Sequence, residues 1–194
     1  KVKAGSVLMI DKNRPEIKFV SPVSGEVTAV NRGEKRKVLS IVVKPDAQIE
    51  YEEFGKKNVA SLQGAEVKEV LLNAGMWPFI KQRPYDIVAA PLDTPRDIFV
   101  SAFYSAPLAP NFDFIVKGQE ADFQTGLNAL AKLTNGKVYV GVRSGSVVSG
   151  MKGVEIVEVE GPHPAANVGV QINHIKPVNK GEVVWTVNPA DVIV

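Results

Sequence analysis

The stretch FQTGLNALAKLTNGKVYVGV, residues 123–142, decides the fold class, because it joins a helical pattern directly to an apolar strand pattern. In its first half, Leu127, Leu130 and Leu133 recur at a spacing that places their side chains on one side of a helix. An Asn-Gly pair follows, and these residues commonly end a helix. The second half, KVYVGV, is almost continuously apolar, which is typical of a strand that is buried on both faces. The stretch therefore predicts a helix followed by a strand that is buried on both faces.

The same alternation continues on both sides of this stretch. DIFVSAFY (97–104) and EVVWTV (182–187) have the composition of strands, and VEIVEV (154–159) alternates as a half-exposed strand does. Apolar residues at positions 168, 172 and 175 fall at i, i+4 and i+7, which gives a second helix an apolar face. Strands that alternate with helices predict a three-layer α/β domain over residues 85–194.

The first 45 residues have a different character. Four short β-rich runs are separated by segments rich in turn residues: VLMI (7–10), IKFV (17–20), GEVTAV (25–30) and KVLSIVV (37–43). Strands this short and this closely spaced predict a small β barrel or sandwich over residues 1–45. The overall fold class is therefore α+β, with a β module ahead of the α/β domain.

Residues 46–84 predict a helical connection between these two parts. Val67, Val70, Leu71 and Ala74 recur at helical spacing, and Gly75 is placed to end the helix as a C-cap. The chain begins with Lys instead of Met and ends abruptly in DVIV, so we expect a fragment of a longer protein.

Composition excludes several classes of protein. The 194 residues carry a net charge of only +2, which does not suggest a nucleic-acid-binding surface. The absence of cysteine excludes disulfides, cysteine-ligated zinc and cysteine-bound iron–sulfur clusters. No apolar run approaches the roughly 20 residues that span a bilayer. The densest basic run, NRGEKRK (31–37), is either a solvated turn or a docking patch for an acidic partner or an anionic lipid surface.

The motifs of common active sites are missing. Neither the dinucleotide-binding fingerprint nor the P-loop occurs, although the glycine-rich segment GVRSGSVVSGMKG (141–153) follows a predicted strand. Such a loop either cradles an anion with its backbone N–H groups or serves turn geometry alone. Ser144 and Ser146 lie in it without the G-x-S-x-G context of a nucleophile. We therefore predict no catalytic residue in this chain.

Both histidines lie within the stretch EVEGPHPAANVGVQINHI (158–175). They are eleven positions apart and match no zinc spacing, so we predict no metal site. Pro162 and Pro164 hold His163 on a stiff loop, and Pro164 suits the first turn of the helix that follows. His174 lies near the end of that helix, where the helix dipole favours a protonated imidazole. The segment predicts a rigid loop that leads into a packed helix.

Three segments resemble a known family, in the same order along the chain. They are GSVLMIDKNRPEIKFVSPVSGEVTAVNRGEKRKVLSIVV (5–43), LLNAGMWPFIKQRPYDIVAAPLDTPRDIFVSAFYSAPLAPN (71–111), and GPHPAANVGVQINHIKPV with VVWTVNPADVIV (161–178 and 183–194). The resemblance is to the A subunits of the bacterial sodium-translocating NADH:quinone oxidoreductases. One departure is that the family often has a His-x-His arrangement after the GPHPA segment, where this chain has QINH.

The resemblance implies membership of a membrane complex that passes electrons from NADH to ubiquinone or another quinone and drives Na+ outward. In that family, the A subunit is a peripheral member on the cytoplasmic side of the bacterial inner membrane, held by the other subunits and especially by one in the membrane. The flavins and the iron–sulfur centre belong to those other subunits, so we expect no cofactor bound by this chain alone. The resemblance also implies an α/β domain related to the flavin-holding domain of respiratory complex I.

A quinone headgroup needs an apolar slot with one or two hydrogen-bond donors. Because the resemblance associates the A subunit with quinone, we predict His163, His174, Trp77 and Phe79 as candidate quinone contacts. The alternative for Trp77 and Phe79 is a hydrophobic anchor after the preceding helix.

Two other functions remain open from the sequence. The opening module also resembles lipoyl and biotinyl carrier domains, which carry a modified lysine on a hairpin turn near a PxxG strand. PVSG (22–25) is present, and Lys12 lies on a predicted turn, so a carrier that uses Lys12 is one alternative. A free-standing enzyme with a site in the glycine-rich loop is the other.

Overall fold

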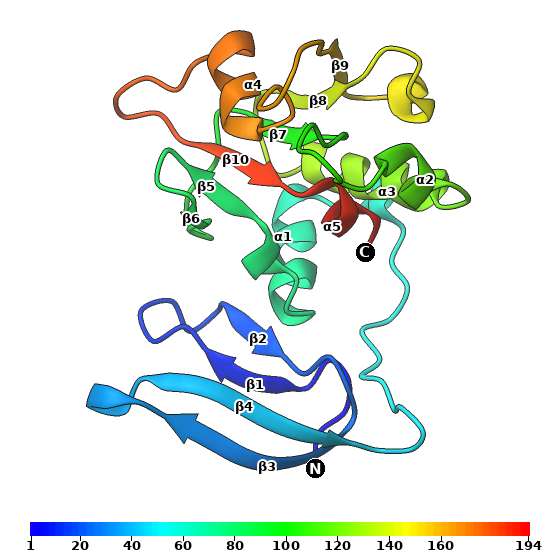
Figure 1. Ribbon diagram of the computed structural model, residues 1–194. Helices are drawn as coiled ribbons and strands as arrows, with labels where there is room; N and C mark the ends of the chain where they lie inside the picture. Colours follow the sequence, from blue (N-terminus) through cyan, green and yellow to red (C-terminus); the bar gives the residue numbers. More distant parts are fainter. The chain divides into compact units, whose positions relative to one another are not determined.

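The computed structural model describes residues 1–194, and the chain divides into two compact units (Figure 1). The first unit comprises Lys1–Lys56 together with Glu69–Pro78. The second comprises Lys57–Lys68 together with Phe79–Val194.

The first unit contains the four strands that the sequence predicts. They form two separate antiparallel ribbons, one made of β1 (Val7–Ile10) and β2 (Lys18–Val20), the other of β3 (Gly25–Arg32) and β4 (Val38–Pro45). A short 3-10 helix, η1 (Glu34–Arg36), lies in the turn between β3 and β4. The basic run predicted as a turn or docking patch therefore forms the tip of the second ribbon (Figure 1).

The helix α1 (Gly64–Asn73) is followed by a glycine that ends it, as predicted. Gly75 has a φ of +71°, and its N–H donates to the carbonyl of Leu72 at 3.3 Å, while the N–H of Met76 donates to that of Leu71 at 2.9 Å. This pair of bonds is the Schellman motif, which satisfies the last carbonyls of a helix. A Cβ at position 75 would lie 2.4 Å from Cγ1 of Val20, so the turn also packs tightly. A 3-10 helix, η3 (Trp77–Phe79), comes directly after this turn.

The second unit is built on a mixed six-stranded sheet in the order β6-β5-β10-β7-β8-β9. β10, β7, β8 and β9 run parallel, and the hairpin of β5 and β6 adds antiparallel strands at one edge. Four of these strands were predicted, and the short strands β5 and β6 were not. The bounds are β5 (Lys81–Arg83), β6 (Ile87–Val88), β7 (Ile98–Ser101), β8 (Val138–Val142), β9 (Glu155–Glu158) and β10 (Val184–Val187).

Helices cover both faces of this sheet, so the α/β prediction is confirmed (Figure 1). On one face, Ile172 packs with Phe99 and Val184. On the other, the apolar side of α3 carries the buried Phe123 and Leu127. Around the sheet lie α2 (Phe112–Val116), α3 (Glu120–Ala131), α4 (Val168–Ile175) and α5 (Pro189–Ile193), with 3-10 helices η2 (Val59–Ser61) and η4 (Val147–Gly150).

The prediction that Pro164 opens the helix after the first histidine was wrong. α4 begins at Val168 with Asn167 as its N-cap. The residues before it close two successive turns, because Ala165 N–H donates to the Pro162 carbonyl and Asn167 N–H donates to the Pro164 carbonyl. Those turns use the backbone groups that a helix starting at Pro164 would need.

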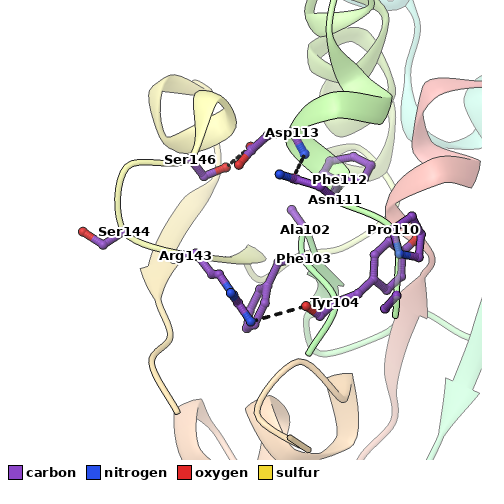
Figure 2. A pocket seen from close by; sticks show the side chains of 11 residues that line it. Ala102, Phe103, Tyr104, Pro110, Asn111, Phe112, Asp113, Arg143, Ser144 and Ser146 are labelled. Carbon is purple, nitrogen blue, oxygen red and sulfur yellow. Dashed lines mark hydrogen bonds between the residues drawn. The ribbon is translucent and has the colours of Figure 1, made fainter. Parts of the chain in front are cut away.

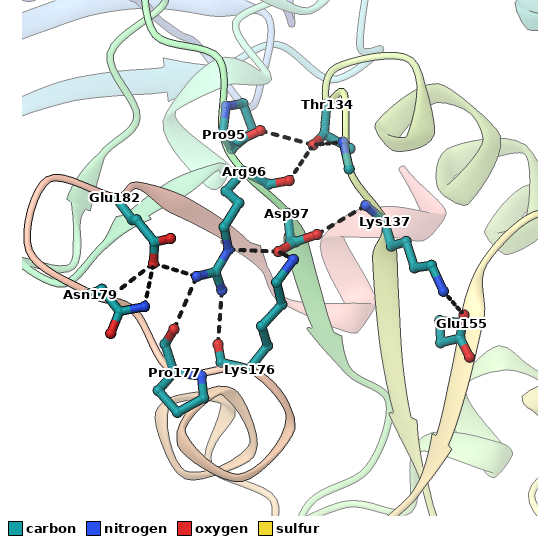
Figure 3. Close-up of polar contacts among 11 residues, drawn as sticks. Pro95, Arg96, Asp97, Thr134, Lys137, Glu155, Lys176, Pro177, Asn179 and Glu182 are labelled. Atoms are coloured by element: carbon teal, nitrogen blue, oxygen red, sulfur yellow. Dashed lines mark hydrogen bonds and ion pairs between the residues drawn. The ribbon is translucent and has the colours of Figure 1, made fainter.

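The amino ends of the parallel strands are tied together by one buried carboxylate (Figure 3). Asp97, immediately before β7, is 1% exposed and accepts hydrogen bonds from Arg96 Nε (2.7 Å), Lys176 Nζ (2.7 Å) and Lys137 N–H (3.1 Å). Lys137 precedes β8 and Lys176 follows α4, so the carboxylate joins three segments that are distant in sequence. Its own backbone carbonyl accepts from Trp185 N–H of β10.

Arg96 extends this network to the connection between α4 and β10 (Figure 3). Its guanidinium donates to the carbonyls of Lys176 (2.8 Å) and Pro177 (3.0 Å) and pairs with Glu182. Burial alone raises the pKa of Asp97, but the hydrogen bonds from Lys176, Lys137 and Arg96 outweigh it, so this pKa lies below its ordinary value. The carboxylate is therefore charged in the folded protein at neutral pH.

Replacing Gly75 with alanine should destabilise the protein, because the new methyl group meets Val20 and the backbone stays left-handed. Gly55→Ala is a matched control, since Gly55 has a similar φ of +74° but nothing within 4 Å of a Cβ. We expect a loss of about 1 kcal/mol for Gly55→Ala from the left-handed backbone alone. Gly75→Ala should lower the free energy of unfolding by roughly 1–3 kcal/mol more than Gly55→Ala does. Urea unfolding measures both, and equal losses would contradict tight packing at Gly75.

Replacing Asp97 with asparagine should cost roughly 3 kcal/mol at neutral pH, because its cationic partners lose their counter-ion. Since the folded-state pKa of Asp97 is lowered, its stabilisation is complete above the unfolded-state value of about 3.9 and is lost as the pH falls through the lower folded-state value. The stability difference between wild type and Asp97→Asn should therefore shrink below about pH 4. Thermal unfolding of both proteins across pH 2–7 measures this difference.

A control variant, Glu155→Gln, removes an exposed ion pair and should change stability little.

Candidate functional site

A pocket of about 270 Å³ lies at the carboxyl ends of β7 and β8, and we call it the carboxyl-edge pocket (Figure 2). The carboxyl ends of parallel strands are where ligands bind in open α/β sheets, because the loops that follow the strands meet there. The polar side chains that line it are Tyr104, Asn111, Asp113, Arg143, Ser144 and Ser146.

Two helix caps fix one wall of this pocket. The Asn111 side chain accepts a hydrogen bond from Asp113 N–H at 2.9 Å and thereby caps α2. Ser146 caps η4, and its hydroxyl donates to the Asp113 carboxylate at 2.6 Å. The same carboxylate accepts from Val147 N–H at 3.2 Å. Asp113 and Ser146 therefore hold α2 against the glycine-rich loop, and their polar groups are largely occupied by this structural role.

The opposite wall carries a positive charge and a neutral phenol (Figure 2). The guanidinium of Arg143 lies 5.3 Å from the ring centroid of Phe103 and makes one long hydrogen bond, 3.5 Å, to the Tyr104 carbonyl. The Tyr104 hydroxyl contacts Asn188 Oδ1 at 3.3 Å. Burial raises the pKa of Tyr104, the bond with Asn188 lowers it, and nearby Asp191 raises it further, so the phenol stays protonated. This wall of the pocket thus offers one cation and the neutral hydroxyl of Tyr104.

This arrangement supports binding better than nucleophilic chemistry. An activated serine needs a general base within hydrogen-bond reach. Ser146 instead donates to a carboxylate that is already bound to a backbone N–H, and neither His163 nor His174 lines this pocket. The glycine-rich loop follows a strand as expected, and Gly145 takes a φ of +76° in it.

A second pocket, of about 450 Å³, lies between the end of β9 and α4, and we call it the α4–β9 pocket. Its walls are mainly apolar, and its polar side chains are Gln171, His174, Glu158 and Glu160. The apolar lining comes from Val157, Val159, Ala165, Val170 and Ile175.

Gln171 and His174 differ in whether their side chains are available to bind a ligand in the α4–β9 pocket. Gln171 is buried, and its amide nitrogen donates to Ser101 Oγ (2.9 Å) and to the Ala165 carbonyl (3.2 Å). A glycine at position 141 makes room for it, since a Cβ there would lie 2.2 Å from the Gln171 amide oxygen. The His174 side chain is exposed and makes no hydrogen bond to another residue. Its ring is therefore the donor that this pocket offers to a ligand.

The other predicted quinone contacts are not among the residues that line this pocket. His163 is exposed, and its Nδ1 lies 3.2 Å from the Ser105 hydroxyl, on the loop after β7. Phe79 belongs to the second unit and is 44% exposed, but it lines neither pocket described above. Trp77 belongs to the first unit and is completely buried, as an anchoring side chain is. Quinone contact through these three residues stays a prediction.

Lys12 lies on an exposed turn between β1 and β2, as the carrier alternative requires. The Asp11 carboxylate shapes this turn by accepting hydrogen bonds from the N–H groups of Asn13 (2.8 Å) and Arg14 (3.2 Å). Covalent modification of Lys12 stays a prediction, and measuring the intact mass of the native protein tests it.

No group of three or more histidine, aspartate or glutamate side chains is arranged to hold a metal ion. No helix in the structure combines the length and the apolar character that crossing a bilayer requires.

Sequence reasoning missed the polar residues at both ends of the sheet. Asp97 directly precedes β7, and Arg143 directly follows β8. Their position at the end of a buried strand was the signal that could have identified them. The serines of the glycine-rich loop are visible in the sequence, but Asp113, which binds one of them, lies 33 residues earlier and gave no local signal.

Comparison with known proteins agrees with this architecture. Residues 1–46 match the family described as the NqrA N-terminal barrel-sandwich hybrid domain, and residues 62–194 match the NqrA second alpha/beta domain. These matches confirm the predicted barrel-sandwich module and the α/β domain that follows it.

Individual relatives share this similarity over the whole chain. The A subunit of the Na(+)-translocating NADH-quinone reductase of Neisseria meningitidis is 38% identical over 99% of this chain, and that of Yersinia pseudotuberculosis is 37% identical over 99%. The corresponding protein of Hahella chejuensis is 38% identical over 100% of the chain. In each case the chain spans 44% of the relative's length. The chain belongs to the NqrA family, as the matches of its two domains, in order, show.

Proposed function

We propose that this chain is part of the A subunit of a Na+-translocating NADH–quinone reductase. In such a complex, electrons pass from NADH to a quinone, and the reaction is coupled to outward transport of Na+. The observation that carries this proposal is the match of both domains, in order, to NqrA, together with relatives of that name at 37–38% identity.

Within that complex, this chain serves as a scaffold that neighbouring subunits hold. Residues 1–194 contain no cysteine to ligate an iron–sulfur cluster and no nucleotide-binding fingerprint, so we assign the electron-carrying groups to other parts of the complex. Its place is peripheral, on the cytoplasmic face of the bacterial inner membrane, against a membrane subunit. The kinship of its α/β domain with the flavin-holding domain of complex I is part of the same proposal.

The α4–β9 pocket is the proposed place of quinone contact. Apolar walls with one or two hydrogen-bond donors suit the ring of ubiquinone or a related quinone. Val157 and Ile175 are among the apolar residues, and His174 offers a ring N–H toward a quinone carbonyl. The carboxyl-edge pocket is less suitable, because it carries the Arg143 cation and most of its lining residues are polar.

Membership of the complex predicts the companions of the native protein. The tagged full-length subunit, purified from native membranes, should bring down the other reductase subunits and Na+-stimulated NADH:quinone reductase activity. The partners are identified by mass spectrometry. Recovery of the tagged protein by itself, or with proteins of an unrelated assembly, would contradict the proposal.

Quinone contact predicts a selective effect of His174→Ala in the assembled complex. Loss of one hydrogen bond of about 1 kcal/mol should raise KM for quinone roughly fivefold. NADH oxidation by an artificial electron acceptor should not change, because that step lies upstream of quinone. Asn173→Ala is the matched control, since Asn173 is the adjacent exposed residue of α4 and lines a different pocket, with Arg83 and Pro84.

A photoreactive quinone analogue gives the direct test of the same pocket. It should label residues of the α4–β9 pocket in the wild-type complex, and His174→Ala should reduce that label more than Asn173→Ala does. Labelling confined to membrane subunits would refute quinone contact and leave membership of the complex intact.

A further inference from the structure

The first unit leaves an unusual amount of apolar surface exposed. Eleven of the nineteen exposed large apolar side chains lie within residues 7–54, which make up only a quarter of the chain. Within residues 1–56, Ala4 and Ile17 are the only buried apolar side chains. A module that forms a stable core by itself shows the opposite distribution.

Strand pairing shows that part of this surface is gathered on one side of the second ribbon. Val27 lies opposite Val43, Val30 opposite Ile41, and Arg32 opposite Val38. Residues that pair directly point to the same face of an antiparallel ribbon. We call this side the hairpin face, and its apolar members are Val27, Val30, Val38, Ile41 and Val43. Of these, Val27, Val30 and Val38 are 36–46% exposed.

The other side of the same ribbon is mainly polar. Glu26 lies opposite Lys44, and Asn31 opposite Ser40, whose hydroxyl accepts a hydrogen bond from the Asn31 amide at 2.9 Å. One apolar pair, Ala29 opposite Val42, lies between them on this side. A ribbon that is apolar on one face and polar on the other is patterned to bury its apolar face.

The strand edges are open as well. β1 pairs only with β2, and β3 pairs with β4 and makes one isolated bridge, from Gly25 to Val2. Along nearly all of its length, each of the four strands therefore has a partner on one side alone. A two-stranded ribbon is marginally stable in water unless further strands or a packed layer cover it. Barrels and sandwiches solve this by closing the sheet or stacking a second one.

We infer that the hairpin face is covered by a segment of the same subunit outside residues 1–194, which completes the barrel-sandwich. Two observations favour a segment of the same subunit as the part that covers the hairpin face. Residues 1–46 match a barrel-sandwich domain but supply only two separate ribbons, and relatives are long enough to provide the rest, because this chain spans 44% of their length. A covalently linked segment also has a high effective concentration for such a contact.

The inference concerns the fold of the subunit and does not depend on electron transfer or quinone. The basic tip of the ribbon, with Lys35, Arg36 and Lys37, continues beyond the apolar members of the hairpin face and remains exposed. An intramolecular layer over the hairpin face thus leaves the tip free.

Site-specific crosslinking in the full-length subunit, within its native complex, tests the inference. A photoreactive amino acid at position 30 should crosslink within the same polypeptide, to residues beyond the 1–194 range. The same group at position 40, on the polar side, is the control and should give no such product. Peptide mass spectrometry identifies the partners. Crosslinks from position 30 only to lipid, to another subunit or to a second copy of this one would overturn the inference, as would no crosslink at all.

A pair of charge substitutions in the full-length subunit gives an independent readout. Val30→Asp places a charge under the proposed layer and should lower Tm by at least about 5 °C relative to wild type, since burying an unpaired carboxylate is costly. Ser40→Asp puts the same side chain on the polar side and should lower Tm by no more than about 1–2 °C. Equal shifts for the two variants would mean that both faces are solvated, which would overturn the inference.

Discussion

The buried carboxylate of Asp97 is the constraint on which the α/β domain depends. A charge that is removed from water is tolerated only when its oxygens are fully hydrogen-bonded and a counter-charge is near. Here the partners come from residue 96, from the start of β8 and from the end of α4. Those segments must therefore adopt their native positions together, and the crossover from β9 to β10 is fixed in place by the same interaction.

The two ends of the parallel sheet consequently differ in character. At the amino ends, Arg96 is saturated by two carbonyls and by the carboxylates of Asp97 and Glu182. At the carboxyl ends, Arg143 has no carboxylate partner, and the α4–β9 pocket adjoins the end of β9. The polar network that fixes the segments in place therefore lies at the amino ends, and polar groups that remain available to a ligand lie at the carboxyl ends. This division suits the scaffold role that we propose for the chain.

Much of the architecture could be predicted from the sequence because it depends on local patterns. KVYVGV formed the buried strand β8, and Gly75 ended α1, since each needs only its neighbours to be recognised. The start of α4 was misplaced because the turns at Pro162 and Pro164 compete with a helix. The hairpin of β5 and β6 was missed because strands of two and three residues carry almost no periodicity.

The candidate sites were harder to predict than the fold, because the Asp113–Ser146 contact joins residues 33 positions apart and only tertiary structure reveals it. The sequence shows which polar side chains are present, whereas the arrangement of the loops at the edge of the sheet determines which of these side chains come into contact.

The contact between Gly141 and Gln171 has a consequence for how this family can diverge. Because the Gln171 amide occupies the space that any side chain at position 141 would need, the two positions are sterically coupled. An alanine or cysteine in the strand is accommodated only where the helix carries a shorter residue at the facing position, and a lone change at either site leaves a clash or a void. Sequence drift at these two positions should therefore be correlated among homologues, and the correlated pairs would mark which members keep the buried amide beneath the α4–β9 pocket.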